Sequence, residues 1–135
     1  MKEFPSIDEV HEILNDISEE LPEDFFKELN EGVVLLPEVK LHSESREDQR
    51  LYIMGRYMRS ITGRNIVLYY GSFKRVYPGI SRESLKTKLR ETLIHEFVHH
   101  MESLAGEKGL EIKDAEDMDK YRNRRWFSYF HIKWP

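Results

Sequence analysis

The amino-acid sequence predicts an α+β fold: helices around a small, mostly antiparallel or mixed sheet. Three observations carry this prediction: helical patterns at the start, three β-rich stretches in the middle, and a long amphipathic pattern near residue 100. A chain of 135 residues is long enough for one hydrophobic core and too short for two. We therefore expect a single domain over residues 1–135, with its core over about 4–124 and an aromatic, basic tail at 125–135.

The first helix is predicted over residues 7–20. Ser6 and Glu9 have the spacing of a capping box, which favours a helix start at this point. Apolar residues then follow at helical intervals: Ile7, Val10, Ile13, Leu14 and Ile17. Pro22 suits the first turn of a second, short helix, and residues 30–32 (Asn-Glu-Gly) are typical of its end.

Stretches rich in β-branched and aromatic residues predict three strands, over residues 33–39, 51–59 and 65–71. The polar segment 40–50 is predicted to be a loop, and Gly63 is expected in the turn between the second and third strands. Because the strands follow one another closely in the sequence, we expect antiparallel pairing to dominate the sheet.

A long helix is predicted from about residue 82 to Ala105, with Ser81 as its N-cap and Gly106 at its end. Its apolar stripe consists of Leu85, Leu89, Leu93, Phe97, Met101 and Leu104. A final polar helix is expected over residues 114–124.

Charge is distributed unevenly along the chain, although the net charge is only −4. Residues 1–31 carry eleven acids against two bases, whereas residues 50–90 carry ten bases against one acid. Such blocks can attract nucleic acid or another anionic partner. The chain has no nucleic-acid-binding signature, so the favoured interpretation is that acidic and basic segments face each other or stay solvated.

The cellular setting follows from what the sequence lacks. No apolar run approaches the roughly 20 residues of a membrane span, and the first residues carry acids where a signal peptide would be apolar. We therefore expect a cytoplasmic protein without a membrane partner. Because the chain has no cysteine, His and carboxylate side chains must hold any metal, and these ligands suit zinc among other divalent ions.

The segment HEFVHH, residues 95–100, contains the H-E-x-x-H spacing within the long predicted helix. At 100° per residue, His95 and His99 project from one face, opposite the main apolar stripe, where two imidazoles can bind one ion. Glu96 flanks that position and can accept a proton from water and pass it to a leaving amine. His100 points elsewhere and is expected to support the metal ligands from behind or to be structural, and not to bind the ion. The alternative is a solvated helix face with incidental histidines.

This motif resembles that of the small single-domain zincin-like metallopeptidases of bacteria. The resemblance also rests on the strand-like LYIMGRY and NIVLYY and the helical LPEDFFKELN, and it covers about residues 4–124. It implies a minimal zincin with one zinc ion per chain, bound by His95 and His99, and with Glu96 as the general base for peptide-bond hydrolysis. It further implies an edge strand that pairs with an extended peptide or unfolded protein substrate, for which residues 51–59 are the candidate.

The third metal ligand departs from the family pattern. Many relatives continue the motif as HExxHHxGxxD, in which the Gly turns the chain and the Asp binds the metal. Glu102 and Ala105 occupy those two positions here. We predict Glu102, one turn beyond His99, as the third ligand, with Asp114 and Glu116 as alternatives.

Two functions are therefore considered. The first is a zinc-dependent metallopeptidase. The alternative is a catalytically silent, zincin-like metal-binding protein that binds a partner or nucleic acid through its basic face. Three tyrosines are weaker candidates for stabilising an oxyanion: Tyr69, Tyr70 and Tyr121. The aromatic tail is expected to pack on the domain or on a second copy, which would make a homo-oligomer.

Overall fold

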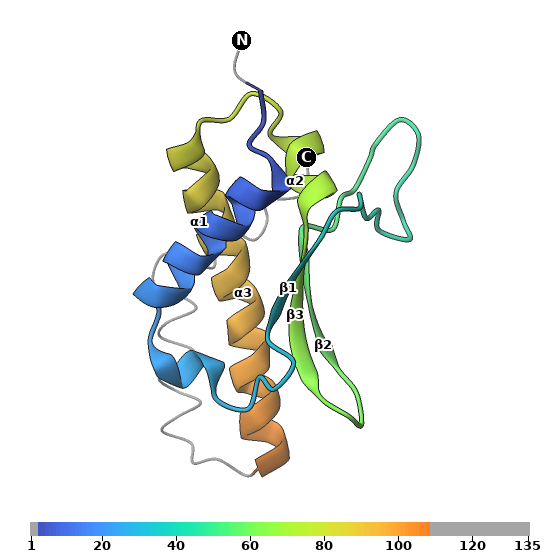
Figure 1. Cartoon of the computed structure of the whole chain (residues 1–135). Coiled ribbons are helices and arrows are strands. Elements are labelled where there is room, and N and C mark those ends of the chain that lie inside the picture. Colours follow the sequence, from blue (N-terminus) through green and yellow to red (C-terminus); the bar gives the residue numbers. More distant parts are fainter. Residues whose placement is uncertain (1–2, 109–135) are drawn as a thin grey trace.

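Helices α1 and α3 lie on one side of a three-stranded sheet in the computed structural model, which describes residues 3–108 (Figure 1). The elements are α1 (Ile7–Glu20), a 3-10 turn η1 (Glu23–Phe26), β1 (Val33–Leu36), β2 (Gly55–Arg59), β3 (Arg64–Tyr69), α2 (Tyr70–Val76) and α3 (Arg82–Lys108). The predicted α+β class is therefore confirmed. The predicted helix over 114–124 and the tail lie outside the described residues.

The sheet is mixed and has the order β1-β3-β2. The central strand β3 runs parallel to β1, with Val34 beside Val67, and antiparallel to β2, with Tyr57 beside Ile66. This order places β2 at an edge. Gly55 begins β2 where it approaches α3: a Cβ there would lie 2.8 Å from Cδ2 of Leu68 and 3.0 Å from Cγ2 of Thr92.

The N-terminal helix has the predicted bounds and cap. The backbone N–H of Glu9 donates to Oγ of Ser6 at 3.2 Å, which satisfies one of the unpaired donors of the first turn. Four residues of the predicted stripe are buried: Val10, Ile13, Leu14 and Ile17. The second predicted helix is a single 3-10 turn, and Gly32 after it adopts a φ of 71°, which glycine accepts without steric cost.

Four predicted boundaries are wrong. The first strand ends at Leu36 and not at Val39, and the second begins at Gly55 and not at Leu51. The third predicted strand ends at Tyr69, and the chain turns at once into α2. Gly71 in its first turn passes so close to the backbone of Glu38 that a Cβ would lie 2.7 Å from its carbonyl carbon, so the position requires glycine. Helix α3 continues through Gly106 to Lys108. Glycine ends a helix when it adopts a left-handed conformation, and Gly106 has no positive φ.

Helix α3 packs directly against β2 and β3, while α1 covers another of its sides. The predicted apolar stripe is confirmed at five positions, which are at most 3% exposed: Leu85, Leu89, Leu93, Phe97 and Leu104. Met101 is only half-buried. No helix among residues 3–108 combines the length and apolar character that crossing a bilayer requires.

His100 ties α3 to the strands and to the segment after η1. Its side chain is fully buried, as expected for a structural residue. Nε2–H donates to the carbonyl of Lys27 at 2.7 Å, so Nδ1 accepts from the hydroxyl of Tyr57 at 2.9 Å. The hydroxyl oxygen of Tyr57 accepts in turn from Nη1 of Arg64 at 3.0 Å. These bonds fix the rotation of α3 about its axis and its height along β2.

The buried ring makes stability depend on pH. Burial holds the pKa of His100 below its usual range, because the charged imidazolium would lose its hydration. The unfolded chain takes up a proton at about pH 6.5, whereas the native ring, with its lowered pKa, takes up a proton only at a lower pH. The stability that the neutral His100 ring contributes to the fold is therefore fully present above about pH 6.5 and is lost as the pH falls below it.

We predict that the contribution of His100 to the free energy of unfolding falls between pH 7.5 and 5.5, by up to about 1.4 kcal/mol, the limit set by the ordinary imidazole pKa of the unfolded chain. Urea unfolding of the wild type and of His100→Gln, measured at both pH values, tests this expectation. The stability difference between the two proteins should shrink at the lower pH. His11→Gln, at an exposed position on α1, is the control and should keep the wild-type pH dependence. An unchanged difference would show that His100 does not resist protonation.

Candidate metal centre

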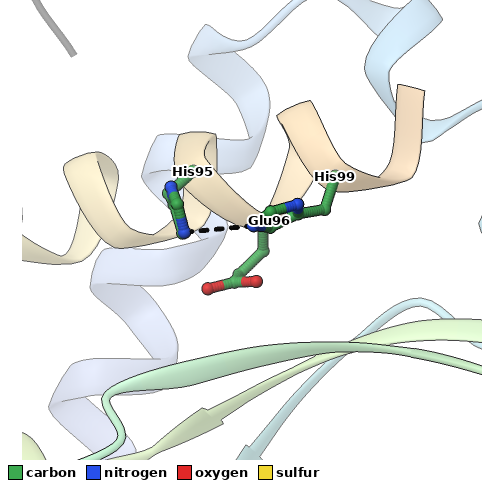
Figure 2. A group of neighbouring side chains, drawn as sticks. All are labelled: His95, Glu96 and His99. Carbon is green, nitrogen blue, oxygen red and sulfur yellow. Dashed lines mark hydrogen bonds between the residues drawn. The ribbon is translucent and has the colours of Figure 1, made fainter. Parts of the chain in front are cut away.

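Three side chains of α3 converge beside the sheet: His95, Glu96 and His99 (Figure 2). Figure 2 shows the Glu96 carboxylate directed away from the helix and toward the strands. One ligand atom from each residue lies within 4.8 Å of the other two. The predicted convergence of the two histidines on one helix face is therefore confirmed, and Glu96 belongs to the same group.

The two imidazoles face each other through their Nε2 atoms. These atoms are 3.2 Å apart, and the rings are inclined by 84°. Zinc binds imidazole nitrogen at about 2.0–2.1 Å, so two such ligands of a tetrahedral ion lie about 3.3 Å from each other. The observed separation thus fits two ligands of one ion. A hydrogen bond between the rings also fits this separation if one nitrogen carries a proton and the other does not.

The side chains differ in exposure in a way that suits this arrangement. Glu96 is only 3% exposed, whereas His95 is half-buried and the His99 side chain is 49% exposed. A carboxylate buried to this extent needs nearby positive charge or hydrogen bonds, and a divalent cation at the histidine pair would supply positive charge. The exposed His99 side chain lets solvent reach the position between the two imidazoles.

A cleft of ≈ 780 Å³ contains the three residues. Helix α3 supplies one wall and β2, with the segment before it, supplies another; eleven residues line it: His42, Ile53, Gly55, Arg56, Tyr57, Arg59, His95, Glu96, His99, Glu102 and Ser103. The prediction that residues 51–59 include a sheet-edge strand beside the cleft is confirmed, although the strand begins at Gly55 and not at Leu51.

Size alone does not single out this cleft. Hollows of ≈ 700 and ≈ 740 Å³ lie at the N-terminal segment and at the β2–β3 turn. Among residues 3–108, the group of potential metal ligands lies in the cleft beside α3, and the two other hollows contain none of its members. We therefore assign the site by its chemistry.

Glu102 lies next to the three residues but outside their group. Its Oε1 is 3.8 Å from Nδ1 of His99, on the edge of the ring away from Nε2. That separation is too long for a hydrogen bond, but it places the carboxylate on the side of the ring from which a partner commonly orients a metal-binding histidine. The geometry does not bring Glu102 to the predicted ligand position. The alternatives Asp114 and Glu116 lie outside the described residues.

Two of the three oxyanion candidates named from the sequence, Tyr69 and Tyr70, do not line the cleft. Tyr69 is buried in the sheet, and the hydroxyl of Tyr70 donates to the carbonyl of Pro5 at 2.7 Å. Tyr121 lies outside the described residues. Sequence reasoning missed His42 and Tyr57, which do line the cleft. No spacing rule links a histidine in a loop to a motif 53 residues later, so only the fold reveals this proximity.

Comparison with known proteins places the chain in a family without assigning an activity. No family model matches the sequence, and no curated protein matches it. The solved structure of a conserved hypothetical protein from Thermus thermophilus is similar to it, with a TM-score of 0.63 and 34% sequence identity. The match covers 75% of this chain and 98% of the other. Because nearly the whole of that protein is matched at this identity, the chain belongs to the same family as this conserved hypothetical protein.

Proposed function

We propose that the protein is a zinc-dependent metallopeptidase of the minimal zincin type. The observation that carries the proposal is the convergence of the His95 and His99 Nε2 atoms, 3.2 Å apart, with the buried carboxylate of Glu96. The alternative is a catalytically silent, zincin-like metal-binding protein that binds a partner or nucleic acid and makes no catalytic use of Glu96. Zinc binding and peptide turnover, measured separately, distinguish the two.

His95 and His99 would hold the metal, because both rings present Nε2 to the same point. A zinc ion held there supplies a Lewis acid for a carbonyl oxygen and lowers the pKa of water to about 7. Glu96 accepts the proton that the attacking water loses and delivers it to the leaving amine. The Glu96 side chain is only 3% exposed and lies at the boundary between the core and the cleft, so few bulk water molecules would compete for its carboxylate.

An extended peptide is the substrate that fits the cleft. Within residues 3–108 the sheet ends at β2, so the outer backbone groups of this strand lie at an edge, in the wall of the cleft beside the histidines. A peptide can add to such an edge by backbone hydrogen bonds, which make few demands on its side chains. Unfolded proteins and unstructured peptides are therefore the first substrates to assay.

The first prediction concerns zinc binding. We expect about one zinc ion per chain and loss of tight binding in His95→Ala and in His99→Ala, because each removes one of two converging nitrogens. Affinity should also fall as the pH is lowered, since only neutral imidazole binds metal. Competition with a chromogenic chelator measures these affinities. His11→Ala is the matched control, and wild-type affinity in either site variant would refute the site.

The second prediction concerns Glu102. If its carboxylate orients His99, Glu102→Ala should weaken zinc binding by about 10–100-fold. Glu102→Gln should restore most of the loss, because the amide oxygen can still accept a hydrogen bond from Nδ1–H of His99. A direct ligand would show the opposite pattern, with Gln nearly as weak as Ala. The same titration applied to Asp114→Ala examines the alternative ligand in the segment after α3.

The third prediction concerns turnover. Glu96→Gln keeps the size and polarity of the side chain but cannot accept the proton, so hydrolysis should fall by about 10²-fold or more. Zinc content and thermal stability should stay close to those of the wild type. Glu83→Gln, at an exposed position in the first turn of α3, is the control and should keep full activity.

A retained rate in Glu96→Gln would attribute the hydrolysis to another site or to a contaminant. A wild type that binds zinc and hydrolyses no peptide would instead favour the metal-binding protein without turnover.

A further inference from the structure

The outer edge of β2 presents the backbone groups of alternate residues. The N–H of Tyr69 in β3 donates to the carbonyl of Met54, the residue before β2, at 3.0 Å. Residues that bond to the partner strand alternate along an antiparallel pair, so Arg56 also directs its N–H and C=O toward β3. Gly55 and Tyr57 therefore direct theirs toward the edge, and a peptide that adds to β2 bonds to these two residues.

The side chain of Arg56 lies on the face of the sheet away from α3. Its two neighbours in β2 face this helix: a Cβ on Gly55 would lie 3.0 Å from Cγ2 of Thr92, and the hydroxyl of Tyr57 donates to His100 at 2.9 Å. Successive side chains of a strand point to opposite faces of the sheet, so Arg56 points the other way. Its side chain is exposed there.

The candidate metal centre, residues 95–99, lies level with this part of β2. On α3 it falls between the residue that approaches Gly55 and the residue that bonds to Tyr57. A peptide bond held at the centre therefore belongs to a segment that passes Arg56, and every second side chain of that segment lies on the same face as Arg56.

The two walls of the cleft differ in charge. The charged residues that β2 contributes are Arg56 and Arg59, both basic, whereas α3 contributes the carboxylates of Glu96 and Glu102. An acidic side chain of a bound peptide would be repelled by these carboxylates if it pointed toward α3. On the opposite face it lies away from them and beside Arg56. Met58, the other outward residue of β2, is uncharged.

We propose that Arg56 is a specificity-determining residue that selects peptides with Asp or Glu in the segment paired with β2. This inference rests on the proposed peptidase function. Because Arg56 bonds to β3, an antiparallel peptide residue opposite it is not hydrogen-bonded to it, and side chains of opposite strands come closest at such positions. Their Cβ atoms are about 4.5–5.5 Å apart, within reach of a guanidinium that can donate two parallel hydrogen bonds to one carboxylate.

Short unstructured peptides that alternate Glu, Gln or Lys with Thr test this preference. The side-chain period of a strand is two, so such a peptide can place every Glu on the face of Arg56 and every Thr toward α3. Fluorescence anisotropy measures their affinities for zinc-loaded Glu96→Gln, which leaves the peptides intact. We expect the Glu–Thr peptide to bind about 3–10-fold more tightly than the Lys–Thr peptide, with the Gln–Thr peptide between them.

Substitutions of Arg56 in the same Glu96→Gln background decide whether this residue causes the preference. Arg56→Glu should reverse the order of the three affinities, and Arg56→Gln should abolish the preference. Arg75→Glu, at an exposed position on α2, changes the net charge equally and is the matched control; it should keep the original order. In zinc-loaded protein that retains Glu96, Arg56→Glu should change KM for the Glu–Thr peptide with little change in kcat, because the contact is present before and during the reaction.

Three outcomes would overturn the inference. The first is the original order of affinities in Arg56→Glu, and the second is the absence of binding by all three peptides. The third is tighter binding of a short single-stranded oligonucleotide than of the Glu–Thr peptide, lost in Arg56→Glu, which would make Arg56 part of a nucleic-acid surface.

Failure of the peptidase proposal is distinguishable from failure of this inference. A wild type that binds zinc and hydrolyses none of the peptides refutes the peptidase proposal. The affinities then decide the role of Arg56 alone: a preference for the Glu–Thr peptide that Arg56→Glu reverses supports recognition of acidic peptides at β2.

Discussion

The rotation of α3 about its own axis is the constraint on which the site depends. One side of this helix must face the core, since Leu85, Leu89 and Leu93 are all 0% exposed. Successive residues of a helix are 100° apart, so once those leucines are buried the directions of all other side chains are set. His95 and His99 then face the cleft. A rotation of α3 by one residue, 100°, would turn His95 and His99 away from the cleft and the leucines away from the core. The packing of the core therefore also keeps the Nε2 atoms of His95 and His99 at the cleft.

Glu96 occupies the boundary between these two environments. Its neighbour Phe97 packs against Phe25 and Phe26, with ring centroids 5.5 and 4.9 Å apart, while His95 on its other side opens to the cleft. The same α3 face carries His100, which would cost free energy to bury without its bonds to Tyr57 and Lys27. Two polar side chains, Glu96 and His100, are thus buried on a helix face where apolar side chains would be the more usual choice. Buried polar residues of this kind are typical of functional sites.

Sequence patterns predicted the structure correctly where helical periodicity or a helix cap determines it. The bounds of α1, the buried stripe of α3 and the shared face of His95 and His99 all follow from helical geometry. Patterns failed where tertiary contacts decide: Gly71 lies in a helix against the backbone of Glu38, and Gly106 stays helical. The β1–β3 pairing is parallel and β2 takes the other edge of β3, an arrangement that strand composition does not encode.

The roles of the histidines follow from the partners of their second nitrogens. Nδ1 of His99 faces the carboxylate of Glu102, an arrangement that leaves Nε2 directed at His95. His100 uses both nitrogens inside the protein and contributes only to packing. The backbone N–H of Glu44 donates to Nδ1 of His42. Rings of identical chemistry thus have different neighbours: a carboxylate lies beside His99, a hydroxyl and a carbonyl bond to His100, and a backbone N–H bonds to His42. Most of these partners lie outside HEFVHH, so a motif can identify a metal site without identifying the groups that complete it.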